Sequence, residues 1–124
     1  MATTTVTISN PIGGLRYSDT AASNSAVNAT AAATTIYHIE FDNTANSAVT
    51  YLKLYEATSV TLGTTEPSVI LKAAAATKEY MSFPMGMAVL TGVSYVATTT
   101  ASNAAGSPAA PSNACGLTVL YKLT

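Results

Sequence analysis

The sequence predicts an all-β protein, a single antiparallel β-sandwich or jelly-roll-like domain with an extended N-terminal arm. Its 124 residues are enough for one domain with a hydrophobic core. About eight strand-like segments follow one another at short spacing, separated by stretches rich in turn-forming residues. No segment has convincing helical periodicity. Short strands at regular spacing, without helices, are typical of sandwiches and jelly rolls.

The clearest strand-like segments lie within residues 35–56. In the first run Tyr37, Ile39 and Phe41 alternate with His38, Glu40 and Asp42, and in the second Leu52 and Leu54 alternate with Tyr51, Lys53 and Tyr55. A polar stretch separates the two runs. Alternation on both sides of a turn-forming stretch predicts two paired, half-buried strands.

The N-terminal part is less regular. The first eight residues, through Thr5-Val6-Thr7-Ile8, predict a short strand, which Asn10-Pro11 and Gly13-Gly14 end. Residues 18–34 have neither helical nor strand periodicity, so we expect an extended arm or a long ordered loop, with a short helix within 26–33 as the alternative. The predicted division is a strand and arm over residues 1–34 and a sandwich over residues 35–124.

The remaining strands are predicted from shorter patterns. Val60 and Leu62 alternate with threonines within residues 58–65, and strands are expected at 69–71, 78–83, 87–90, 93–100 and 117–123. Residues 73–76 and 101–114 predict loops, and Pro84-Met85-Gly86 predicts a tight turn. The last strand is apolar enough to lie inside a sheet.

Composition indicates a protein that packs against neighbours. Charged residues make up 9% of the chain, against about 25% in a typical soluble domain. Short neutral side chains replace them, and these let surfaces approach without desolvating ions. A surface simply rich in hydroxyl groups is the alternative interpretation. We expect a subunit that is permanently in contact with other subunits.

Other classes of partner are not supported. The five basic residues are scattered and the net charge is −1, so no stripe exists to bind nucleic acid. The N-terminus does not resemble a secretory signal, and no apolar run reaches the roughly 20 residues needed to cross a bilayer. We expect a chain made in a cytoplasm, for which a role outside the cell would need export by lysis or as part of a larger particle.

The candidate catalytic residues do not form a complete set. His38 is the single histidine and lies beside Glu40, but no serine has a G-x-S-x-G setting. Cys115 is the single cysteine, which excludes an internal disulfide, and we expect it to be a small buried hydrophobic residue. Glu40 and Asp42 would lie roughly 7 Å apart on one strand face, where a solvated face is more common than a glycosidase pair.

Binding sites for small ligands are equally weak. Asp42, Asn43, Thr44 and Asn46 offer oxygen atoms to Ca²⁺, but their spacing matches no EF-hand and favours a polar turn. No phosphate-binding glycine loop is present. The tyrosines could form a sugar-binding platform, although packing or interface burial explains most of them better: Tyr37, Tyr51, Tyr55, Tyr80, Tyr95 and Tyr121. We therefore predict no enzyme and no catalytic, cofactor or metal residues.

Three stretches carry a resemblance to a known group. YHIEFDNTANSAVTYLKLYEAT, VTLGTTEPSVILK and FPMGMAVLTGVSYVATTT, with a Gly/Pro/Ala loop and a closing apolar strand, resemble small virion proteins of tailed bacteriophages, especially those of marine and cyanobacterial phages. The resemblance covers roughly residues 36–123 and transfers no catalytic residue.

The resemblance implies a virion structural protein. A capsid cement or decoration subunit bound at capsomer junctions comes first, and a tail- or fibre-associated subunit is the alternative. Its partners would be further copies of itself, expected as a homotrimer, and the major capsid protein. A carbohydrate-binding module that uses exposed tyrosines and residues 42–47 is a weaker alternative.

Overall fold

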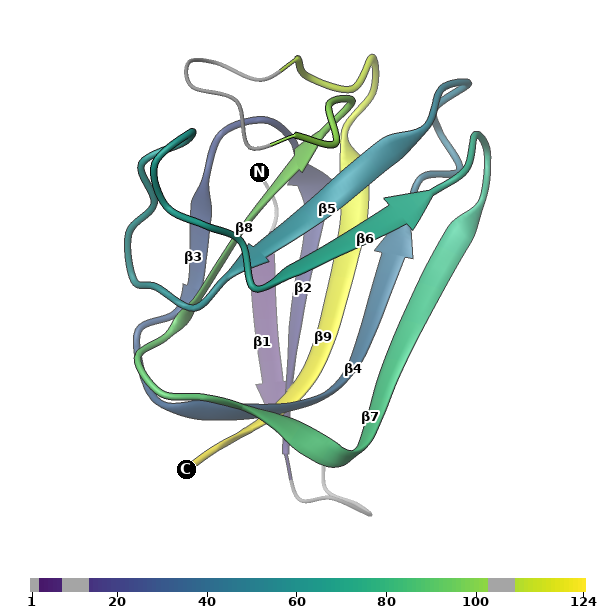
Figure 1. Ribbon diagram of the computed structural model, residues 1–124. Helices are drawn as coiled ribbons and strands as arrows, with labels where there is room; N and C mark the ends of the chain where they lie inside the picture. The colour runs from purple at the N-terminus through teal and green to yellow at the C-terminus, as the bar shows by residue number, and fades with distance from the viewer. Residues whose placement is uncertain (1–2, 8–13, 103–108) are drawn as a thin grey trace.

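The computed structural model describes residues 3–7, 14–102 and 109–124, and it confirms the predicted β-sandwich. Figure 1 shows the strands as two layers packed face to face. In chain order the strands of the described residues are β1 (Thr3–Thr7), β2 (Leu15–Ala22), β3 (Val27–Thr30), β4 (Thr34–Asp42), β5 (Thr50–Tyr55), β6 (Val69–Ala73), β7 (Lys78–Val89), β8 (Val93–Thr98) and β9 (Cys115–Leu123).

One layer is a five-stranded sheet in the order β1-β2-β9-β4-β7, and the other is a four-stranded sheet in the order β3-β8-β5-β6. The pairings are antiparallel. β9 lies between β2 and β4 with Leu117, Val119 and Tyr121 buried, which confirms that the last strand lies inside a sheet.

The core fills the space between the two layers. Ile36, Ile39 and Phe41 of β4 are fully buried, as is Leu52 of β5. Alternate residues of a strand point to opposite faces, so β2, β4, β7 and β9 of the five-stranded sheet each give one face to this core. β8 is buried along its whole length, from Val93 to Thr98, so the outer face of the four-stranded sheet is partly covered as well.

The predicted pairing of the two strands in residues 35–56 is wrong. β4 pairs with β7 and β9, whereas β5 pairs with β6 and β8 in the other sheet. Residues 43–49 therefore cross from one layer to the other instead of closing a hairpin. Alternation identifies the buried face of a strand, and both strands do face the core, but it does not identify the neighbouring strand.

The N-terminal segment also differs from the expected arm. Within residues 1–34, β2 pairs with β9 and β3 pairs with β8, so both strands belong to the sandwich. Tyr17, Asp19 and Ala22 of β2 are buried. The inward-facing Asp19 is polar and the register shifts between Asp19 and Ala22, and both features hid the alternation of β2 from the sequence pattern. Ile8 and the two predicted breaks at Asn10-Pro11 and Gly13 lie outside the described residues.

The predicted turn at Pro84-Met85-Gly86 is a bulge within one long strand. His38 stands opposite Ser82 and Ile36 opposite Met87, so residues 83–86 face Tyr37 alone. Gly86 has φ +81°, which glycine adopts without strain, and Figure 1 shows β7 bending at its lower end. The bulge also moves Tyr37 out of the buried series, because Ile36 and Ile39 now occupy the core positions on either side.

Of the remaining predicted segments, the strand at residues 58–65 is wrong, and the loops at 73–76 and 101–114 can be compared with the structure. Residues 58–65 form turns instead of a strand, with the Thr64 and Thr65 amides both donating to the Thr61 carbonyl. Ala73 ends β6, and residues 74–77 form the expected connection, in which Ala76 has φ +55°. The described parts of 101–114 contain no strand.

Candidate functional site

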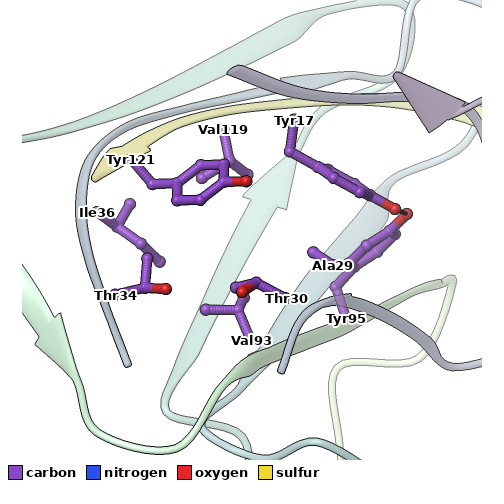
Figure 2. Close-up of a pocket in the computed structure, with 9 residues that line it drawn as sticks. All are labelled: Tyr17, Ala29, Thr30, Thr34, Ile36, Val93, Tyr95, Val119 and Tyr121. Carbon is purple, nitrogen blue, oxygen red and sulfur yellow. Dashed lines mark hydrogen bonds between the residues drawn. The ribbon is translucent and has the colours of Figure 1, made fainter. Parts of the chain in front are cut away.

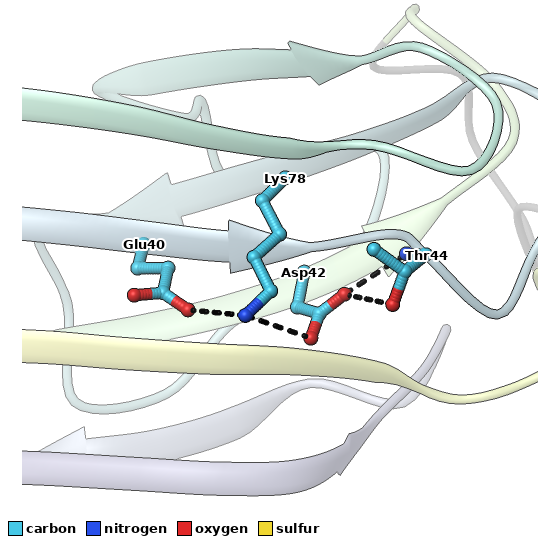
Figure 3. A network of polar contacts seen from close by, with 4 residues as sticks. All are labelled: Glu40, Asp42, Thr44 and Lys78. Atoms are coloured by element: carbon cyan, nitrogen blue, oxygen red, sulfur yellow. Dashed lines mark hydrogen bonds and ion pairs between the residues drawn. The ribbon is translucent and has the colours of Figure 1, made fainter.

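A group of polar and aromatic side chains lies on β4 and β7, and we call it the β4–β7 cluster: His38, Glu40, Asp42, Lys78 and Tyr80. Glu40 and Asp42 lie on the outer face of β4, as their spacing predicted, and Lys78 reaches them from the first position of β7 (Figure 3). Its Nζ is 3.4 Å from Glu40 Oε1 and 3.8 Å from Asp42 Oδ2. One ammonium group therefore joins both carboxylates.

His38 and Tyr80 extend the cluster along the sheet. Their ring centroids are 5.9 Å apart with the planes inclined by 29°. The Ser82 hydroxyl lies 2.8 Å from His38 Nδ1, which fixes the orientation of the imidazole ring. Tyr80 is 56% exposed, so one aromatic ring remains open to a partner beside two half-buried carboxylates.

The charges in the cluster stabilise one another. Burial opposes ionisation of Asp42, but hydrogen bonds from the Thr44 hydroxyl and amide, together with Lys78, lower the pKa of its carboxyl group. Glu40, followed by Asp42, raises the pKa of Lys78. The surrounding groups thus favour the ionised form of Asp42 as a partner for Lys78. The cluster offers charged and aromatic groups for contact with a partner.

The crossing from β4 to β5 is held by amide side chains. Asn43 is buried, and its Nδ2 donates to the carbonyls of Ala48 at 2.9 Å and Ala74 at 3.0 Å. Asn46 Nδ2 donates to Asn43 Oδ1 and to the Asn113 carbonyl, both at 3.0 Å, and its Oδ1 accepts from the Asn113 amide.

The predicted polar turn is confirmed by the Thr44 amide, which donates to Asp42 Oδ1 at 2.9 Å. The amide oxygens that Ca²⁺ would need are thus occupied by the chain itself. Within the described ranges, no three His, Cys, Asp or Glu side chains gather where they could hold a metal ion.

Three polar side chains meet inside the sandwich, and sequence reasoning missed them. The Tyr17 and Tyr95 hydroxyls lie 2.7 Å apart, and the Tyr95 hydroxyl donates to Asp19 Oδ2. The Ala21 amide donates to the other carboxyl oxygen at 2.8 Å, and Asp19 is 0% exposed. Burial is the main cause of the raised pKa values of both tyrosines. The group joins β2 of one sheet to β8 of the other.

The two tyrosines also line a small gap between the layers. Figure 2 shows their hydroxyls meeting at one side of the gap, with Tyr121, Ile36 and Thr34 at the other. The gap measures about 10 Å³, which is room for about one water molecule. It is too small for an organic ligand and marks imperfect packing between the sheets.

Two further buried polar groups, the Lys53 ammonium and the Cys115 thiol, have partners within the chain. Lys53 is 2% exposed, its Nζ donates to the Ser102 carbonyl at 2.6 Å, and burial lowers its pKa. Cys115 is buried, as predicted, and desolvation raises the pKa of its thiol to about 11. A thiol with such a raised pKa is a poor nucleophile at neutral pH, and Cys115 contacts Asn43 and Asn46, not His38.

The tyrosines do not form a common platform, and most of them pack within the sandwich, as the sequence predicted. Tyr55, Tyr95 and Tyr121 are buried, and Tyr37 and Tyr51 are half-buried. The exposed large apolar side chains of the described residues come from other positions as well: Ile70, Tyr80, Met85, Leu90 and Leu123. Apart from Tyr80, nothing in the sequence pattern distinguished them from core residues.

Among the described residues, no helix has the length and hydropathy to cross a membrane. Comparison with family models, curated proteins and solved structures found no significant match to this chain.

Proposed function

We propose that the chain is a bacteriophage virion structural protein, most specifically a capsid cement or decoration subunit that stabilises the shell at capsomer junctions. The proposal rests on the resemblance of three stretches to small virion proteins and on the charge-poor composition. A tail- or fibre-associated subunit remains the alternative role. Neither role requires a catalytic group.

The observation that carries the proposal is the exposure of large apolar side chains on a closed, rigid fold. Met85 is 94% exposed and Leu90 is 76% exposed, so both side chains lie outside the core. Both lie in or next to β7, an edge strand of the five-stranded sheet. Large apolar side chains that stay this exposed on a small domain with few charges favour a surface that another protein covers.

The proposed partners are the major capsid protein and further copies of this chain. A homotrimer would match the local three-fold positions of a shell, and this oligomer order stays a prediction. A rigid sandwich is suited to such a role, because it presents preformed surfaces and orders few residues on binding.

Copy number in purified particles tests the proposal. Quantitative mass spectrometry should find the chain in hundreds of copies per virion if it covers the shell, and in a handful if it belongs to the tail. Adding the purified protein to shells that lack it should raise their resistance to heat. Particles that contain none of the chain would refute both virion roles.

Carbohydrate binding is the second candidate, favoured by the exposed Tyr80 ring. A sugar ring could stack on Tyr80, with Glu40 and Lys78 as hydrogen-bonding groups at its edge. A glycan array should then show binding that Tyr80→Ala removes and that Tyr51→Ala, on the other sheet, leaves intact. An array without any bound glycan would eliminate this candidate.

A further inference from the structure

The outer face of the five-stranded sheet carries most of the charged side chains that are not buried: Arg16, Glu40, Asp42, Lys78 and Lys122. Their strand neighbours Tyr17, Phe41 and Tyr121 point into the core, so Arg16, the two carboxylates and Lys122 point away from it. Lys78 stands directly opposite Asp42 on the paired strand. Within the part of the chain that the structure describes, no strand covers this face, because the second sheet packs against the other one.

The charges are divided by sign between the two ends of this face. Glu40 stands opposite Thr118 of β9, and Lys122 lies on that same strand, roughly 13 Å from Thr118 at a rise of about 3.3 Å per residue. Arg16 of β2 lies towards the same end as Lys122. We call Arg16 and Lys122 the basic end of the face, and Glu40 and Asp42 the acidic end.

The two ends keep charges of opposite sign. At the acidic end Lys78 Nζ lies 3.4 Å from Glu40 and 3.8 Å from Asp42 (Figure 3), so one negative charge remains in excess. The two carboxylate side chains are still 31% and 32% exposed. At the basic end Arg16 and Lys122 are exposed, and among the described residues neither forms an ion pair with a carboxylate.

We propose that a second copy of this chain packs against this face about a two-fold axis that runs across the strands, so that the basic end of each copy lies on the acidic end of the other. Rotation about such an axis reverses the strand direction, and Lys122 of one copy then approaches Glu40 and Asp42 of the other. A face with opposite charges at its two ends thereby pairs its own charges, twice by symmetry. A partner of another sequence would need the same division of charges in reverse, which this chain already supplies.

The face is suited to a weak contact. Ser18, Gly116 and Thr118 lie between the two ends and have short, neutral side chains, so a second sheet can approach to the usual distance of about 10 Å. We count β2, β9, β4 and only residues 78–82 of β7, which pair with β4. These strands cover roughly 20 Å by 23 Å, or roughly 500 Å², which is at the low end for specific interfaces. The contact should therefore depend on its charges and weaken with salt.

Sedimentation of the purified full-length protein tests the inference. A monomer–dimer equilibrium should appear between about 10 μM and about 1 mM protein. Raising the ionic strength from about 0.05 M to about 0.5 M should raise the dissociation constant roughly fivefold, because salt screens exposed charges. A contact of this kind closes at two copies, so a trimer would support the homotrimer that the resemblance implies and would overturn this inference. A monomer at every concentration would overturn it as well.

Reversing the charges tests the pairing itself. Lys122→Glu and Glu40→Lys should each raise the dissociation constant about tenfold, because symmetry alters two contacts at once. The double variant exchanges the signs and should return to within about threefold of the native value. Lys72→Glu, at an exposed lysine of the other sheet, is the matched control and should leave the dimer unchanged. Circular dichroism checks folding, and Arg16→Glu replaces any single variant that does not fold.

Two further results would contradict the pairing. These are a dimer that both single variants leave intact, and a double variant that associates no better than the weaker single variant. The inference does not depend on the virion role. A monomer found in particles contradicts only the inference, and a dimer absent from particles contradicts only the proposed function.

Discussion

At the scale of single residues, the most consequential side chain is Asp19. Its carboxyl group is fully buried between the sheets, and its oxygens accept hydrogen bonds from the Tyr95 hydroxyl and the Ala21 amide. A buried carboxyl group is tolerated only where such donors replace water. Through Asp19, the Tyr95 hydroxyl adds a polar connection between β2 and β8 to the apolar contacts that hold the two sheets together.

We predict that Tyr95→Phe destabilises the protein by about 2–4 kcal/mol, because it leaves a buried carboxyl oxygen without its donor. Tyr17→Phe should have the smaller effect, about 1 kcal/mol, since Tyr17 bonds to Tyr95 and not to the carboxyl group. Urea denaturation followed by circular dichroism measures both. Equal effects of the two substitutions would contradict the central role given to Asp19.

The Cys115 thiol predicts a loss of stability at alkaline pH. Burial raises its pKa from 9.0 to about 11 in the folded protein. Between pH 9 and pH 11 the thiol ionises in the unfolded chain but not in the folded one, and this ionisation favours unfolding. The free energy of unfolding should therefore be highest, as far as Cys115 is concerned, below pH 9 and should fall by about 2–3 kcal/mol as the pH rises to 11. Free energies of unfolding at pH 8 and pH 10.5 measure the loss.

Cys115→Ala supplies the control for this pH dependence. The variant should lose less stability than the native protein between the two pH values, whatever its stability at pH 8. The buried tyrosines contribute equally to both proteins, so the difference isolates the thiol. Identical losses would show that Cys115 ionises as readily in the folded as in the unfolded chain.

At the scale of the elements, the bulge in β7 determines where the strand bends. Gly86 has φ +81°, and a β-carbon there would come within 2.3 Å of Thr35 Cγ2 on the paired strand. Gly86→Ala should therefore destabilise the protein by about 2–4 kcal/mol through backbone strain and steric overlap. Gly116→Ala meets Asp42 Cβ at 3.1 Å without a positive φ, so its effect should be smaller. Thermal unfolding compares the two variants, and the reverse order would contradict the prediction.

The elements also show what the sequence could predict. Alternation located β4, β5 and β9 and their buried faces, because period-two patterns depend only on the strand itself. Pairing depends on residues far along the chain, and so the hairpin between β4 and β5 was predicted wrongly. Pro84 and Gly86 are turn-forming residues, but here they form a bulge, since β7 continues to pair with β4 beyond them.

In the candidate site, too, the sequence could predict what depends on one strand and not what depends on pairing between strands. His38, Glu40 and Asp42 could be placed on one face from their spacing alone, and the structure confirms this. Lys78 and Tyr80 join them only through the register between β4 and β7, which no local pattern reveals. The exposure of Met85 and Leu90 could not be predicted either, because an apolar run has the same composition in a core strand and on an exposed edge.

At the scale of the whole molecule, the sandwich depends on pairing between the two ends of the chain. β2, near the N-terminus, pairs with β9, near the C-terminus, and β9 in turn pairs with β4. Such pairings close long loops before they stabilise the fold, so folding should be slow for a domain of this size. They also make β2 and β3 part of the cooperative unit and not a detachable arm.

Deleting residues 1–30 should therefore unfold the protein, because it removes β2 and β3 along with the buried Tyr17, Asp19 and Ala22. Deleting residues 1–7 removes only the edge strand β1, and the remaining sandwich should keep a cooperative thermal transition. Circular dichroism during heating distinguishes the two outcomes. A native transition after the longer deletion would mean that these residues act as an arm, as the sequence first suggested. If the protein unfolds instead, loss of shell binding by that variant says nothing about an arm, and only the shorter deletion can test whether the N-terminus contacts a neighbouring subunit.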